Sequence, residues 1–233
     1  MNHDLCSLEE FLNHSRENNL EGVNDCLSRG VDVNTKNQYG TTALMVACYA
    51  GNSAIVSRLV QVPGLDINDW DEDVVTAAHL ACSQAHGRTE SVRILAETGR
   101  VDWNKRNIQG YTPLSWALVG GHSDIVDIIV QQPNIYYNVK TQRGHTLSEI
   151  AVQGGDVECV ETLAALESFD CWNVPDSDGN TPVMIALNRE QGELVEILLG
   201  CPRVDLSCRD KDGWSLLFRA IQRKKLGEKM CQC

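Results

Sequence analysis

GYTPLSWA, residues 110–117, is the clearest copy of a short string that recurs along the sequence. The other copies share its threonine or serine and its closing alanine, and they lie at 40–47, 76–81, 144–151, 179–186 and 213–220. The closing alanines are 34 to 36 residues apart. Self-similarity at this period is typical of proteins built from stacked supersecondary units, each of which buries its apolar face against its neighbours.

Each string predicts the start of a helix, and each is followed by the signals of a second one. Thr112 offers a side-chain oxygen to the unpaired amides of a first turn, and Pro113 already has a helical φ. Glycines such as Gly121 permit the reversal that ends this first helix. Apolar residues at helical spacing then predict second helices at 55–60, 91–95, 125–130, 159–163 and 194–199.

After each second helix a short segment leads into a projecting turn, which we call a finger. The last residue of a finger is usually glycine, as at 37–40, 107–110, 176–179 and 210–213. Val74 stands at this position in the second repeat, where a branched residue at positive φ costs roughly 1 to 2 kcal/mol. We therefore expect that finger to have another shape, and an insertion at 85–88 adds to the irregularity of this repeat.

These strings, helix pairs and fingers together resemble the ankyrin repeat, and the resemblance covers essentially the whole chain. It implies an all-α fold, an ankyrin-repeat α-solenoid of stacked helix-turn-helix units with projecting β-turn fingers. We expect an N-terminal capping helix pair and first finger at 1–39 and five repeats at 40–212. The expected repeats are 40–73, 74–109, 110–143, 144–178 and 179–212, followed by a partial terminal repeat at 213–233.

Composition limits the classes of protein that fit this pattern. A hydrophobic content of 42% is enough to bury a core, and a formal net charge of -12 disfavours nucleic acid as a partner. The N-terminus lacks the order of a secretory signal, and no apolar run is long enough to insert into a membrane. We expect a cytoplasmic protein, with the nucleus as the alternative, whose 10 cysteines are reduced and mostly buried.

No string typical of catalysis or of cofactor binding is present, so we expect no enzyme activity, no cofactor and no metal. His79 and Cys82 have the spacing of half a metal site, but Cys48, the equivalent cysteine of the preceding repeat, should lie too far away to complete it. In the resemblance, His79 occupies a structural position that ties adjacent repeats by hydrogen bonds.

The resemblance also implies where a partner protein binds, along the finger tips and the outward positions of the first helices. The expected protein-binding residues are Lys36, Tyr39, Tyr49, Trp70, Arg106, Tyr111, Lys140, Arg143, Arg189, Arg209, Lys211 and Trp214. Many are cations or aromatics on an otherwise acidic chain, whereas the second helices carry acidic residues. An acidic segment of another protein would fit such a surface. The alternative is that the cations are only solvated turn residues.

The function expected from this pattern is a monomeric, non-catalytic protein-protein interaction module that acts as an adaptor or scaffold. The alternative is a targeting arm of a larger enzyme or channel, such as the substrate receptor of a ubiquitin ligase, because the final repeat at 213–233 has no apolar second helix to cover it.

Overall fold

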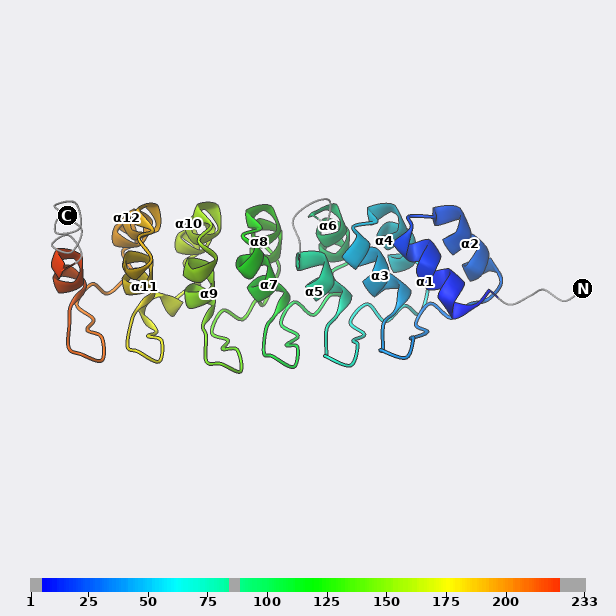
Figure 1. The fold of residues 1–233 in the computed structure, drawn as a ribbon. Coiled ribbons are helices and arrows are strands. Elements are labelled where there is room, and N and C mark those ends of the chain that lie inside the picture. The colour runs from blue at the N-terminus through cyan, green and yellow to red at the C-terminus, as the bar shows by residue number, and fades with distance from the viewer. Residues whose placement is uncertain (1–5, 84–88, 223–233) are drawn as a thin grey trace, which may run out of the picture. The chain divides into compact units, whose positions relative to one another are not determined.

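The computed structural model describes residues 6–83 and 89–222 (Figure 1). These residues divide into two compact units, one ending at Ile135 and the other beginning at Tyr136. The expected insertion at 85–88 and the end of the partial terminal repeat lie outside the described residues. The described secondary structure consists of α-helices and one short 3-10 helix, with isolated β-bridges at the fingers and no strands. The predicted all-α class is confirmed.

In the first unit, helices form pairs, and successive pairs contact each other. The first helices of the pairs are α1 (Leu8–Arg16), α3 (Ala43–Ala50), α5 (Ala77–Cys82) and α7 (Pro113–Gly120). The second helices are α2 (Leu20–Ser28), α4 (Ser53–Val60), α6 (Thr89–Glu97) and α8 (Ser123–Val130). Each helix contacts its partner in the pair and the equivalent helix of the neighbouring pair. The fingers project from one edge of these pairs (Figure 1).

The second unit repeats this arrangement. It contains α9 (Leu147–Gly154), α10 (Val157–Ala165), the 3-10 helix η1 (Cys171–Asn173), α11 (Pro182–Asn188) and α12 (Gly192–Gly200), followed by helical residues 216–222. Helix α9 contacts α11, and α10 contacts α12. Phe169 and Trp172 are buried beside each other, with ring centroids 4.9 Å apart, and fill the space next to η1.

The helix ends follow the sequence signals. Thr112 is the N-cap of α7 and its hydroxyl accepts a hydrogen bond from the Ser115 amide (3.2 Å), a contact typically worth about 1 kcal/mol. Equivalent side-chain caps form at Thr42, Thr76 and Thr146. Gly121 ends α7 in the left-handed region at φ 66°. The predicted N-caps and helix-ending glycine are therefore confirmed.

Most of the closing alanines are buried within the first helices, which contact the first helices of neighbouring pairs. Ala47, Ala81 and Ala117 have 0% of their surface exposed. A larger side chain at such a site would have to displace its packed neighbours, which typically costs 1–3 kcal/mol. This close packing explains why alanine recurs at the end of each string.

The expectation that the cysteines are all reduced is wrong for one pair. Cys6 and Cys26 form a disulfide, with Cα atoms 5.3 Å apart. Cys6 precedes α1, Cys26 lies in α2, and the packing of these two helices brings the thiols together. The other cysteines of the described residues form no disulfide, and most are buried: Cys48, Cys82, Cys159, Cys171, Cys201 and Cys208.

The expectation that the finger at Val74 has another shape is also wrong. Val74 adopts φ 58°, the left-handed conformation that glycine adopts in the other fingers. Its amide donates to the Asp71 carbonyl (3.0 Å), and the Asp71 amide donates to the Val75 carbonyl (3.1 Å). The hydrogen bonds of the finger therefore hold Val74 in a conformation that is unfavourable for a branched side chain.

Candidate protein-binding surface

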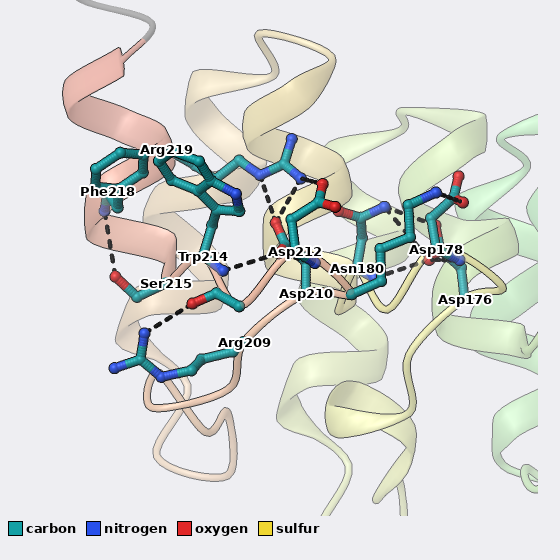
Figure 2. Close-up of polar contacts among 12 residues, drawn as sticks. Asp176, Asp178, Asn180, Arg209, Asp210, Asp212, Trp214, Ser215, Phe218 and Arg219 are labelled. Carbon is teal, nitrogen blue, oxygen red and sulfur yellow. Dashed lines mark hydrogen bonds and ion pairs between the residues drawn. The ribbon is translucent and has the colours of Figure 1, made fainter.

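Every described finger except the one that begins at Thr141 is built in the same way, with a side-chain oxygen that accepts hydrogen bonds from backbone amides two and four residues later. Asn107 Oδ1 accepts from the amides of Gln109 (3.0 Å) and Tyr111 (2.9 Å). The same pair of bonds forms at Asn37, Asp71, Asp176 and Asp210. Figure 2 shows Asp176 and Asp210 in this role. These side chains order the finger backbone before any partner arrives.

Three pairs of neighbouring fingers are also bonded to each other. In the first unit, the Glu72 amide donates to the Tyr39 carbonyl (3.2 Å) and the Ile108 amide donates to the Asp73 carbonyl (3.0 Å). In the second unit, the Lys211 amide donates to the Asp178 carbonyl (3.2 Å). The tips therefore form ordered surfaces rather than independent loops.

The glycine of the finger is needed for a second reason besides its φ. A Cβ atom on Gly40 would lie 2.9 Å from the Asp71 Cα atom, and one on Gly179 would lie 2.6 Å from the Lys211 amide nitrogen. Both distances are too short for a side chain, so the close approach of adjacent fingers also requires glycine there.

Trp70 is the centre of the surface in the first unit. It is 44% exposed, and the Lys105 ammonium lies 3.8 Å from its ring centroid while that of Lys36 lies at 5.5 Å. Lys36 also donates to the Trp70 carbonyl (2.9 Å) and pairs with Asp69. The structure thus brings together two residues expected to bind a partner and adds Lys105. The sequence signal for Lys105 was its position next to Arg106.

Tyr39 and Tyr49 are the expected residues with the most open aromatic rings in this unit, at 60% and 52% exposed. Tyr39 lies in the first finger and Tyr49 near the end of α3. Tyr111 is half-buried, and its carbonyl accepts from His79 Nε2 (3.1 Å), so its backbone has a structural role.

Two of the expected arginines brace their own fingers. Arg106 donates through Nε to the Gly110 carbonyl (3.3 Å), and Arg209 donates through a terminal nitrogen to the Gly213 carbonyl (2.8 Å). Both side chains remain exposed. At these two positions the arginines thus hold the backbone of their own fingers, in addition to being exposed to solvent.

The other expected residues of the second unit lie in several settings. Arg189 donates to the Gln153 carbonyl (3.3 Å), and Lys211 pairs with Asp178 of the neighbouring finger. This carboxylate raises the pKa of the Lys211 ammonium. Lys140 and Arg143 are exposed at the finger that begins at Thr141. The cations of this unit thus reach the surface at the fingers that begin at Thr141 and Asp210, while the finger between them carries acidic residues.

Trp214 packs against Phe218, with ring centroids 3.7 Å apart (Figure 2). Beside them Arg219, which was not expected from the sequence, donates to Asp210 (2.6 Å). Burial raises the pKa of the Asp210 carboxyl, but the bonds donated by the Trp214 amide and by Arg219 outweigh it and lower this pKa below its ordinary value. No sequence signal linked Arg219 to Asp210, because the contact depends on how residues 216–222 turn back over the finger.

Acidic side chains of the second helices are exposed, as expected: Glu90, Asp124, Asp127, Glu158, Glu161, Glu193 and Glu196. The fingers carry acids as well, including Glu72, Asp73 and Asp212, which are also exposed. The cationic character of the fingers is therefore local, centred on Trp70 in the first unit and on Lys140 and Arg143 in the second.

His79 is fully buried and joins two repeats, as predicted. Its Nδ1 atom lies 2.9 Å from the Thr76 hydroxyl and its Nε2 atom bonds the Tyr111 carbonyl. Burial lowers the pKa of His79 to about 4 and raises that of the Cys82 thiol. Across 6–83 and 89–222, no three histidine, cysteine or acidic side chains are grouped to hold a metal ion. No described helix is long and apolar enough to cross a bilayer.

A family model described as ankyrin repeats in three copies matches residues 12–107, 64–141 and 148–232. Among solved structures, the chain is similar to the ankyrin repeat domain of Bcl-3, with a TM-score of 0.77 and 22% identity. This match covers 91% of the chain and 93% of the Bcl-3 domain, and it supports the fold.

Curated relatives match over shorter stretches. The chain is 31% identical over 109 residues to an ankyrin repeat protein of Rickettsia bellii, covering 46% of this chain and 59% of the relative. It is 32% identical over 95 residues to alpha-latrotoxin-Lg1a of Latrodectus geometricus, covering 40% of this chain and 7% of the toxin. A human mitochondrial disaggregase is 43% identical over 62 residues, which are 27% of this chain and 9% of the disaggregase. The chain thus spans less than two thirds of each of these relatives.

Proposed function

Because the chain belongs to the ankyrin repeat family, we propose that it is a non-catalytic protein-binding module, an adaptor or scaffold that holds a partner along its fingers and first helices. Repeats of this family generally serve protein-protein interaction. The observation that most supports a binding surface here is Trp70, an exposed tryptophan flanked by the Lys36 and Lys105 ammonium groups on hydrogen-bonded fingers.

The proposed contacts are the finger and first-helix residues expected from the sequence, with Lys105 added. Tryptophan, tyrosine and arginine are the residues that most often supply binding energy at protein interfaces. Ordered fingers reduce the conformational entropy that a partner must remove when it binds. Tyr39 and Trp70 offer the apolar contact area, and the surrounding cations favour an acidic segment of the partner.

A capture experiment from source cells tests this function. The full chain is compared with the variant Trp70→Ala plus Lys105→Ala, which removes the ring and the nearer ammonium. We expect the variant to lose most of the captured partner. Arg93→Gln on α6 is the control, since this arginine lies on a second helix and its removal also lowers the positive charge. Equal capture by the double variant and by the unchanged chain would refute the assignment of the site.

We also propose that the protein acts in the cytoplasm or nucleus as a monomer and binds no nucleic acid. The formal net charge of -12 supports the last point, because duplexes bind through cations that neutralise phosphates.

A second candidate function is the targeting arm of a larger protein, such as a ubiquitin-ligase substrate receptor. It is favoured by the latrotoxin and the disaggregase, in which the matching stretch is 7% and 9% of the whole protein. The reading frame downstream of residue 233 in the transcript distinguishes the two candidates.

A further inference from the structure

One pair of neighbouring fingers in the second unit is not bonded tip to tip. At the other pairs of fingers that lie within one unit, the second residue of one finger donates its amide to the carbonyl of the third residue of the finger before it. The equivalent atoms here are the Ser177 amide and the Arg143 carbonyl, and within the described residues neither has a hydrogen-bond partner. A Cβ on Gly144 would meet no atom within 4 Å, in contrast to Gly40 and Gly179.

The separation leaves a groove of about 260 Å³ between the two fingers. Lys140, Arg143, Gly144 and His145 line it from one finger, Pro175, Asp176 and Ser177 line it from the next, and Glu149 of α9 also contributes. The sequence suggests one cause for the opening. Thr141 begins the finger in place of Asn or Asp and its hydroxyl accepts one amide, that of His145 (3.2 Å), where the other fingers accept two.

The acidic groups of the groove are already engaged. Glu149 binds His145 and accepts from Gln153 (2.9 Å). Asp176 accepts from the amides of Asp178 (2.9 Å) and Asn180 (2.8 Å), and the Asn180 side chain also donates to it. These contacts satisfy the carboxylates within the protein, so the groove has little capacity to accept hydrogen bonds from a ligand.

Two donors of the groove, in contrast, are open. Among the described residues the Arg143 guanidinium has no ion pair or hydrogen bond, and the Ser177 amide has no acceptor. A planar guanidinium beside a backbone amide matches the two oxygens of a carboxylate. We propose that this groove binds an aspartate or glutamate side chain of the acidic segment, with Arg143 and the Ser177 amide as the groups that contact it. This inference rests on the proposed function, because it names the chemistry that one part of the finger surface recognises.

Two substitutions remove these donors without removing structural contacts. Arg143→Gln removes the charge of an exposed side chain that makes no hydrogen bond or ion pair with the other described residues. Ser177→Pro removes the amide hydrogen of residue 177. This residue is the second in a turn that is closed by a hydrogen bond from the Gly179 amide to the Asp176 carbonyl (3.1 Å), and proline is favoured at that position. Thermal unfolding of both variants should match that of the unchanged chain.

The binding test uses a fluorescein-labelled peptide of alternating glutamate and glycine, followed by anisotropy and by amide NMR. We expect the Ser177 and Arg143 amide resonances to shift, Arg143→Gln to raise the Kd about 10-fold and Ser177→Pro to raise it about 5-fold. A glutamine-glycine peptide should not bind, and Arg93→Gln should bind the acidic peptide as the unchanged chain does. If inorganic phosphate shifts the same resonances at lower concentration than the peptide, the assignment of a carboxylate is overturned.

Comparison of peptide binding with capture from source cells distinguishes failure of the carboxylate site from failure of the proposed protein-binding function. Unchanged affinity of Arg143→Gln and Ser177→Pro for the acidic peptide overturns the groove as a carboxylate site. If capture still depends on Trp70 and Lys105 in that case, the protein-binding function stands. If capture depends on neither set of residues, the proposed function itself fails.

Discussion

His79 shows how one side chain can join two repeats and report on protonation. Its Nε2 atom donates to the Tyr111 carbonyl, so its Nδ1 atom accepts from the Thr76 hydroxyl, and the ring is neutral. Burial lowers its pKa to about 4 in the folded protein, from an ordinary value of 6.5. Between these values the unfolded chain binds a proton that the folded protein does not, and stability therefore rises with pH across this interval.

We expect the contribution of His79 to stability to be complete above pH 6.5 and to be lost as the pH falls to about 4. The difference is about 3 kcal/mol at most, from 1.36 kcal/mol per pKa unit. Urea unfolding at several pH values checks this, with His79→Gln as the comparison because carboxylates also contribute to the pH dependence. If both proteins lost the same stability between pH 7 and pH 4.5, His79 would not be the group responsible.

Val74 offers a second test at the scale of one residue. Replacing it with glycine relieves a strain of roughly 1 to 2 kcal/mol but adds flexibility to the unfolded chain. We expect Val74→Gly to raise the free energy of unfolding by about 0.5 to 1 kcal/mol in denaturant melts. The reverse change, Gly110→Val, lies at the equivalent position of the next finger. Because residue 110 adopts φ 83°, we expect this variant to lower the free energy of unfolding. Stabilisation by Gly110→Val would contradict this account.

At the scale of the element, the finger is an Asx turn whose quality depends on its first residue. Asn, Asp and Thr all occur there, but only the carboxylate and amide oxygens accept two backbone amides in this structure. Within the units, the finger that begins at Thr141 is also the one whose tip is not bonded to the next finger. The first residue of this turn and the open groove therefore occur together, and a substitution at Thr141 can test whether they are linked.

Thr141→Asn tests this relation. The new side chain should accept from the amides of Arg143 and His145, as Asn107 accepts from Gln109 and Tyr111, and raise the free energy of unfolding by about 1 kcal/mol. Thr141→Val, which removes the single bond to His145, should lower it by a similar amount. Denaturant melts of the three proteins should rank them in that order, and any other ranking would show that the turn residue does not control the finger.

At the scale of the whole molecule, the chain is two compact units built from one kind of repeat. Each unit presents fingers with cations and aromatics and carries exposed acids on its second helices. The formal net charge of -12 keeps such a protein soluble through self-repulsion, while local cations on the fingers attract acidic groups at short range. The proposed binding surface therefore depends on local arrangement rather than on total charge.

The sequence by itself determined the repeat, the helix pairs, their caps and the positions of the fingers, because each of these depends on residues only a few positions apart. Thr112, Gly121 and Ala117 could be assigned their roles from spacing alone. The sequence also placed Val74 correctly at the glycine position of its finger. The finger keeps the common shape because its hydrogen bonds to Asp71 outweigh the strain at Val74.

Only the tertiary structure decided which side chains distant in the sequence meet. The disulfide between Cys6 and Cys26 joins the start of α1 to α2 within one helix pair. The ammonium of Lys105 over the Trp70 ring and the open groove beside Arg143 join residues of neighbouring repeats, about 35 positions apart. These last contacts arise because stacking brings the fingers of neighbouring repeats side by side, so the pattern of a single repeat does not contain them.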